Sequence, residues 1–237
     1  MTRRPVPFLV ALAAVPTAAL AVWAWRRWGY PVHAVERDVA TAAEPPPTPE
    51  PAGPRALQPE ESGVGPRFHR RYRVDIAHPE LTAEEVIERI GSDVQHFAPA
   101  EIAVFHKTRG AEGRLAVGDE FDITIRSPWN GPVRVVEAEP TWFTLATLEG
   151  HLEAGKIRFE AAPHPSVPGA LRFTIESWAR SADAAVDVVY DDLGVAKEAQ
   201  QAMWTYFCEQ VAEDCGGERM GAVEVETERA PDPEDDG

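Results

Sequence analysis

Apolar and polar residues alternate with a period of two in several short stretches between residues 66 and 181, a pattern typical of half-buried strands. In the first stretch, 68–76, apolar side chains fall on even positions, among them Phe68, Tyr72 and Ile76. Six further strands are predicted, with turn residues between most of them: 102–108, 121–126, 133–138, 142–148, 156–161 and 171–176. The pattern therefore predicts seven strands that each turn one face toward a core.

Two segments show helical spacing instead. Thr82 and Glu85 have the spacing of a capping box, and apolar residues follow them at helical intervals, which predicts a helix that ends at Gly91. Residues 194–214 predict another helix, because Trp204, Cys208 and Val211 lie on one helical face.

The N-terminus contains an uncharged apolar run from Pro5 to Trp25, 21 residues long. A helix of this length spans about 30 Å, the thickness of the hydrocarbon core of a bilayer. Arginines flank both ends of the run, so residues 1–33 are predicted to be an anchor with a single transmembrane helix. The alternative is a cleaved signal peptide, with 19–21 as the cleavage site.

The predicted domain, residues 66–216, lies between two segments of different composition. Residues 34–65 include seven prolines between 44 and 59, which favours an extended polyproline linker. A ligand for a proline-recognition domain is the alternative, since Pro46 and Pro49 have PxxP spacing. Residues 217–237 are rich in Asp and Glu and are predicted to be a disordered acidic tail.

Composition excludes several classes of protein. Asp and Glu outnumber Lys and Arg by 39 to 23, for a net charge of −16, which argues against a nucleic-acid groove. The 2 cysteines are too few for a disulfide scaffold or a four-thiolate zinc site. The histidines are dispersed, and no glycine-rich phosphate-binding motif is present. We therefore expect neither a metal nor a cofactor.

The order of predicted elements is a strand, one or two helices, six strands and a final helix. It resembles the helix-grip fold of the START-like (SRPBCC) superfamily. The resemblance implies an α+β fold, in which a curved antiparallel sheet of about seven strands wraps around a long C-terminal helix and encloses a cavity. In the predicted fold class, this domain is preceded by the single transmembrane helix.

Residues 147–156 read T-L-E-G-H-L-E-A-G-K and resemble the signature of an uncharacterised START-like family, the domain of unknown function "nineteen-ninety". That family typically reads T-L-P-G-H-P-E-x-G-E at this place. Glu149 and Leu152 stand where the family has prolines, and Lys156 stands where it has the second glutamate. Further similarities lie at Gly118–Asp119, at 177–180, and at Gln200 or Gln201 before Tyr206.

His151, Glu153 and Arg180 are the candidate catalytic residues. A spacing of two places His151 and Glu153 on one side of an extended segment, where the carboxylate could orient the imidazole for proton transfer. In the structural alternative, His151 bonds to the backbone, Glu153 pairs with Arg180 or Lys156, and the two glycines of the motif supply the bends. We expect this structural arrangement, at one end of the sheet beside the cavity entrance.

The cavity that the resemblance implies would have apolar walls. Its candidate ligand-binding residues lie on predicted strands and on the last helix: Trp142, Phe159, Phe173, Met203 and Phe207. The tryptophans of the chain fit a pocket wall or ordinary core packing equally well.

Three functions fit these observations. The favoured one is a membrane-tethered START-like domain that binds a lipid or another hydrophobic small molecule. In this interpretation the protein is a single-pass membrane protein, and the family resemblance places its domain on the cytoplasmic side. The alternatives are a cyclase- or hydrolase-type enzyme that uses His151 and Glu153, and a non-catalytic interaction scaffold. Polar groups that converge in the cavity would favour the enzyme, and a cavity filled by Trp and Phe would favour the scaffold.

Overall fold

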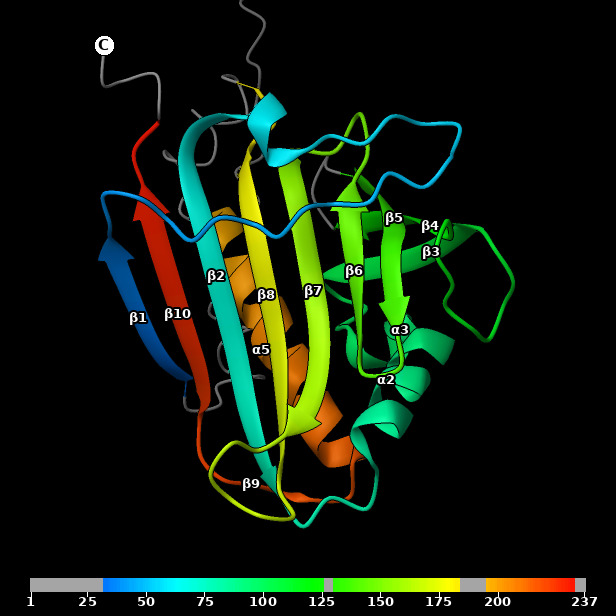
Figure 1. The fold of residues 1–237 in the computed structure, drawn as a ribbon, viewed down its shortest axis with the longest axis vertical. Coiled ribbons are helices and arrows are strands. Elements are labelled where there is room, and N and C mark those ends of the chain that lie inside the picture. Colours follow the sequence, from blue (N-terminus) through cyan, green and yellow to red (C-terminus); the bar gives the residue numbers. More distant parts are fainter. Residues whose placement is uncertain (1–31, 126–129, 184–194, 233–237) are drawn as a thin grey trace, which may run out of the picture.

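The computed structural model describes residues 32–125, 130–183 and 195–232. Within these ranges, ten strands form one mixed sheet in the order β1-β10-β2-β8-β7-β6-β5-β4-β3, with β9 paired to the end of β2 (Figure 1). The strands are β1 (Val32–Asp38), β2 (Val64–Ala77), β3 (Ala103–Arg109), β4 (Glu120–Ile125), β5 (Asn130–Glu139), β6 (Trp142–Thr147), β7 (Glu153–Pro163), β8 (Leu171–Ser181), β9 (Glu218–Arg219) and β10 (Val223–Ala230). The helices are the 3₁₀-helix η1 (Glu60–Ser62) and the α-helices α2 (Ala83–Ser92), α3 (Val94–Phe97) and α5 (Val195–Asp214).

Helix α5 packs on one face of the sheet, behind β2, β8 and β7 in Figure 1. We call this the inner face and the opposite one the outer face. Side chains alternate along each strand, so Tyr72 and Val74 of β2 are buried on the inner face, whereas Arg71 and Arg73 lie on the outer face. The alternation predicted for residues 68–76 is therefore present in β2.

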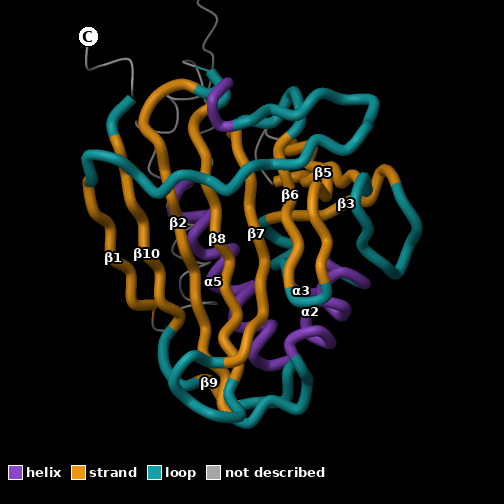
Figure 2. The backbone as a smooth tube through the Cα atoms, viewed as in Figure 1, coloured by secondary structure: helices purple, strands orange, loops and turns teal. Residues whose placement is uncertain are grey.

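Helices α2 and α3 follow β2 and pack beside one end of the sheet (Figure 2). The predicted capping box begins α2: the Glu85 N–H donates to Thr82 Oγ1 at 3.2 Å, and the Thr82 N–H donates to Glu85 Oε2 at 2.7 Å. Both bonds satisfy amide groups that the first turn of a helix leaves without partners.

Residues 39–58, which we call the strap, cross the outer face between β1 and η1 (Figures 1 and 2). Two buried cations bind its carbonyl groups. Lys156 of β7 donates to the Pro46 carbonyl and to Thr48 Oγ1, and Arg134 of β5 donates to the carbonyls of Pro51 and Arg55 at 3.2 and 2.7 Å. The segment predicted as a linker is thus extended, but it lies against the sheet.

The acidic C-terminal segment is ordered where a disordered tail was predicted, and this prediction is wrong for residues 218–230. Strand β10 pairs antiparallel with β2 and parallel with β1. Val223 and Val225 are buried in the core, at 0% and 2% exposure. The glutamates between and after them bind outer-face arginines, as in the Arg73–Glu226 contact at 2.8 Å. Distant positive charge therefore compensates the repulsion that favoured disorder.

The predicted fold class requires correction. The sheet has ten strands rather than about seven, and it is mixed rather than antiparallel. The chain does not end on a helix, because β9 and β10 follow α5.

The predicted transmembrane helix falls on residues 1–31, outside the described ranges. Across 32–125, 130–183 and 195–232, no helix is both long enough and apolar enough to span a bilayer. For this described part of the chain, the prediction of a single-pass membrane protein is corrected.

Candidate functional site

The motif of residues 147–156 forms the turn between β6 and β7 and the first residues of β7. Gly150 has a φ of +95° and open space where a Cβ would lie, so it is required by backbone conformation alone. Gly155 has a φ of +154°, and a Cβ there would stand 2.0 Å from the Trp178 carbonyl oxygen. Glycine is therefore needed at 155 because β8 approaches too closely for any side chain.

His151 is held against main chain on both sides of its ring. Its Nδ1 accepts the backbone N–H of Glu153 at 2.9 Å. Its Nε2 faces Gly131, where a Cβ would lie only 2.5 Å away. Burial lowers the pKa of His151, against an opposing effect of Glu153. The ring is accordingly neutral and carries its proton on Nε2.

The side chain of Glu153 points to the inner face. Gln200 of α5 donates to its two carboxylate oxygens at 3.3 and 3.2 Å, and Arg70 Nη1 lies 3.9 Å from Oε1. Tyr72 is the next inward residue of β2, and burial raises its pKa to about 12, so the phenol stays protonated. We call Arg70, Tyr72, Glu153 and Gln200 the inner polar cluster.

Two members of this cluster have unused hydrogen-bonding capacity. The Gln200 carbonyl oxygen Oε1 is buried and has no partner in the part of the chain that the structure describes. The 3.9 Å between Arg70 and Glu153 is longer than a hydrogen bond, although Arg70 is only 6% exposed. Gln200 Oε1 is therefore an acceptor available to a ligand. The Arg70 guanidinium stacks on the Phe68 ring, 4.5 Å from its centroid, and keeps donors that Glu153 does not use.

The sheet next to the inner polar cluster is lined by small side chains. Ser177 pairs with Arg70 in the β2–β8 register, and Ala179 and Ser181 follow it on the same face. On the neighbouring strand β7, Gly155 lies opposite Ala179. Small side chains thus line this end of the inner face.

The aromatic side chains predicted to bind a ligand form a packed layer below that end. Phe159 lies 5.3 Å from Phe207, and Phe173 lies 6.1 Å from Phe207, between ring centroids. Met203 belongs to the same buried cluster. Trp142 does not join them, because it lies on the outer face under the Arg158 guanidinium, 4.0 Å from the ring centroid.

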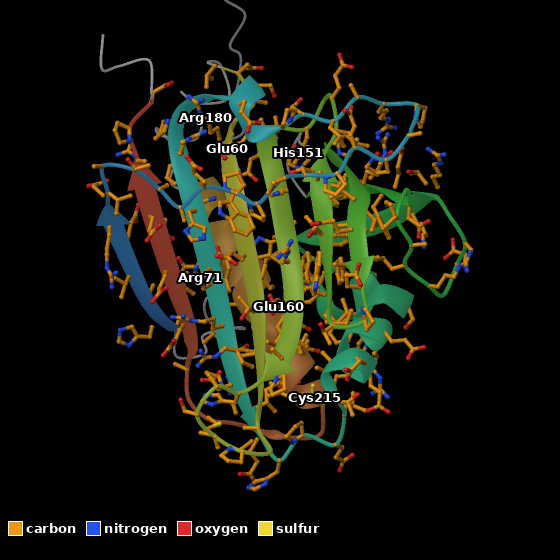
Figure 3. All side chains as sticks on the ribbon, in the orientation of Figure 1. Glu60, Arg71, His151, Glu160, Arg180 and Cys215 are labelled. Atoms are coloured by element: carbon orange, nitrogen blue, oxygen red, sulfur yellow. The ribbon has the colours of Figure 1, made fainter. Side chains whose placement is uncertain are left out.

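The three candidate catalytic residues do not form one centre. Arg180 lies on the outer face of β8, where it donates to the Gly65 carbonyl at 3.0 and 2.8 Å and pairs with Asp232 at 2.8 Å. His151 and Arg180 lie toward the same end of the sheet (Figure 3), but Glu153 points to the opposite face from Arg180. Within the described ranges, no three His, Cys, Asp or Glu side chains gather as a metal site would require.

Sequence reasoning missed Arg70 as a site residue. A signal for it existed, because residue 70 is a charged residue at an inward position of a strand whose other even positions are apolar. Gln200 was noted only for its resemblance to the family helix. Its amide could not be assigned to Glu153 without the fold.

Residues 59–207 match the family model described as a domain of unknown function, DUF1990. The chain belongs to this family. The family predicted from the motif around His151 is thereby confirmed. The strands β1, β9 and β10 and the whole strap lie outside the matched region. None of the curated proteins matches this sequence.

Several solved structures are similar to this DUF1990 chain at low identity. A hypothetical protein of Helicobacter pylori is 10% identical, with a TM-score of 0.44, and the match covers 61% of this chain and 86% of that one. Norcoclaurine synthase from Thalictrum flavum, solved with dopamine and hydroxybenzaldehyde, is 13% identical, with a TM-score of 0.43 and coverages of 69% and 96%. These scores are too low to carry an argument about function.

Proposed function

We propose that this DUF1990 domain binds an amphipathic small molecule between the sheet and α5. The polar head of the molecule would contact the inner polar cluster, and its apolar part would lie against the small-residue end of β7 and β8. The observation that carries the proposal is the buried, unpartnered Gln200 Oε1 beside a buried Arg70 that no hydrogen bond joins to Glu153. Because buried polar groups in folded proteins are normally paired, the unpartnered Gln200 Oε1 supports a ligand that supplies a donor there.

The chemistry of the cluster restricts the head group. Arg70 offers hydrogen-bond donors and positive charge, so it favours an anionic or strongly polar acceptor. Gln200 Oε1 requires a donor. A head group that carries both an acceptor and a donor, such as a hydroxy acid or an acidic amide, satisfies both residues.

Native mass spectrometry of the purified protein tests the proposal directly. We expect a non-covalent adduct of small-molecule mass, absent after denaturation. A titration with 8-anilinonaphthalene-1-sulfonate, which joins an aromatic body to an anionic sulfonate, gives an affinity in the absence of the natural ligand.

The Arg70→Met variant should bind this dye at least about tenfold more weakly, since hydrogen bonds to charged groups contribute about 1.5–3 kcal/mol. Arg71→Met is the matched control, because its side chain lies on the outer face. Equal affinities in both variants and the parent, together with no adduct, would exclude the proposed site.

A second candidate, the non-catalytic interaction scaffold, is favoured by the aromatic layer. Phe143, Phe159, Trp204 and Phe207 pack with centroid separations of 4.7–5.9 Å, which fills the middle of the inner face. In a scaffold, the dye would bind without dependence on Arg70, and mass spectrometry would detect no adduct.

A further inference from the structure

The end of the strap is bonded to the turn that carries Glu153. Gln58 Nε2 donates to the carbonyl oxygens of His151 and Glu153 at 2.8 and 3.0 Å. The Gln58 backbone N–H donates to the Thr147 carbonyl at 2.8 Å, and the Gly155 N–H donates to the Gln58 carbonyl at 3.0 Å. One residue of the strap thus binds main chain on both sides of the motif turn.

This arrangement joins the outer face to the inner polar cluster. The Gln58 side-chain amide donates to the backbone carbonyl of Glu153. The carboxylate of Glu153 accepts from Gln200 on the inner face. Rotation of this backbone segment would move the carboxylate relative to Arg70 and Gln200. The Gln58 amide therefore limits the positions that Glu153 can adopt.

The strap itself is fixed at two further places. Lys156 binds it at Pro46 and Thr48, and Arg134, which is 1% exposed, binds it at Pro51 and Arg55. A proline-rich backbone has few N–H donors, and its carbonyl groups have no internal hydrogen bonds. Cationic side chains, which donate hydrogen bonds, are therefore well suited to hold it. Gln58 is consequently attached to the sheet through the rest of the strap.

We infer that Gln58 is a positioning residue for the inner polar cluster, and that the strap controls ligand binding through it. The inference rests on the proposed function for its effect on affinity. Its effect on Glu153 does not depend on any ligand. The two effects can therefore be measured separately.

The ligand-independent measurement is the NMR signal of the Gln200 side-chain amide, which donates to the Glu153 carboxylate and is assigned by its loss in Gln200→Ala. Gln58→Glu removes both donors without a change in size. We expect this variant to shift the Gln200 amide signal and to lower the affinity for 8-anilinonaphthalene-1-sulfonate at least about fivefold. Gln58→Lys, which restores donors, should recover most of both effects.

Gln95→Glu is the matched control. Gln95 is half-buried like Gln58, and its amide also donates to two backbone carbonyls, those of Ala98 and Ala103, far from the cluster in the fold. This variant should lose stability but leave the Gln200 signal and the dye affinity unchanged. If Gln58→Glu does not fold, Gln58→Met removes the donors without added charge and carries the same expectations.

An unchanged Gln200 signal in a folded Gln58 variant would overturn the inference, as would equal shifts in the Gln58 and Gln95 variants. If the parent protein neither binds the dye nor carries a small-molecule adduct, the proposed function fails. The Gln200 signal still decides whether Gln58 positions Glu153.

Discussion

The glycines of the motif turn illustrate how one atom decides a local structure. Gly150 and Gly155 are five residues apart, and both have positive φ angles, of +95° and +154°. Open space surrounds the first, whereas the carbonyl of Trp178 blocks any Cβ at the second. The same substitution should therefore have very different costs at the two positions.

Gly155→Ala should destabilise the protein by at least about 3 kcal/mol, because overpacking and backbone strain each cost roughly 1–3 kcal/mol. Gly150→Ala has only the backbone cost, about 1–2 kcal/mol. Urea unfolding of both variants measures the difference. Equal losses would show that β7 and β8 separate easily at this point.

The stability of a His151 variant distinguishes a structural role of this residue from a catalytic one. His151→Ala leaves the part-buried Glu153 N–H without its acceptor, so we expect the free energy of unfolding to fall by about 1–3 kcal/mol. His106→Ala, at an exposed position of β3, is the control and should have little effect. A catalytic His151 predicts unchanged or raised stability in the first variant instead. Thermal melts distinguish the two roles.

At the scale of elements, β10 depends on charges that lie far away in the sequence. His69 of β2 is 5% exposed and bonds Glu228 of β10 at 3.0 Å and Glu176 of β8 at 2.7 Å. Burial lowers the pKa of His69, but the two carboxylates outweigh this effect and raise it. A hydrogen bond to His69 lowers the pKa of Glu228.

The docking of β10 should therefore be strongest in a middle range of pH. A raised histidine pKa stabilises the fold below the unfolded pKa of about 6.5, and this contribution is lost as pH rises through the folded value. The lowered Glu228 pKa stabilises above its unfolded value and is lost as pH falls. We expect His69→Gln to remove the decline of stability on the alkaline side, as measured by urea unfolding between about pH 6 and 9. A parental decline that persists in the variant would assign it to another group.

Local patterns predicted the strands and the α2 cap, because their determinants lie within a few residues. The period-two alternation of Val223 and Val225 with Glu224 and Glu226 was also visible. Dense acidic charge predicts disorder in this segment, because the arginines that compensate it lie far away in β2. The docking of the strap required Lys156 and Arg134, whose proximity only the folded sheet creates.

For the whole molecule, the segments outside the family match are integral to the sheet. A chain that ends at residue 216 would lose β9 and β10 and expose β2. It would also lose the burial of Val223 and Val225, which contributes roughly 1.5–3 kcal/mol for each side chain. We expect this truncated chain to unfold at a clearly lower urea concentration than the full chain, as followed by circular dichroism. An unchanged midpoint would show that residues 217–237 contribute little to the stability of the sheet.

The parallel pairing of β1 with β10 joins the first and the last described strands of the chain. During synthesis, β1 leaves the ribosome early and has no partner until residues near the C-terminus are made. The contact has a very long sequence separation, and such contacts form slowly. We therefore expect the family-matched region to collapse first and the β1 edge to close last, once β10 has been made. The nascent protein would carry an open sheet edge for most of its translation, the period in which chaperone contact matters most.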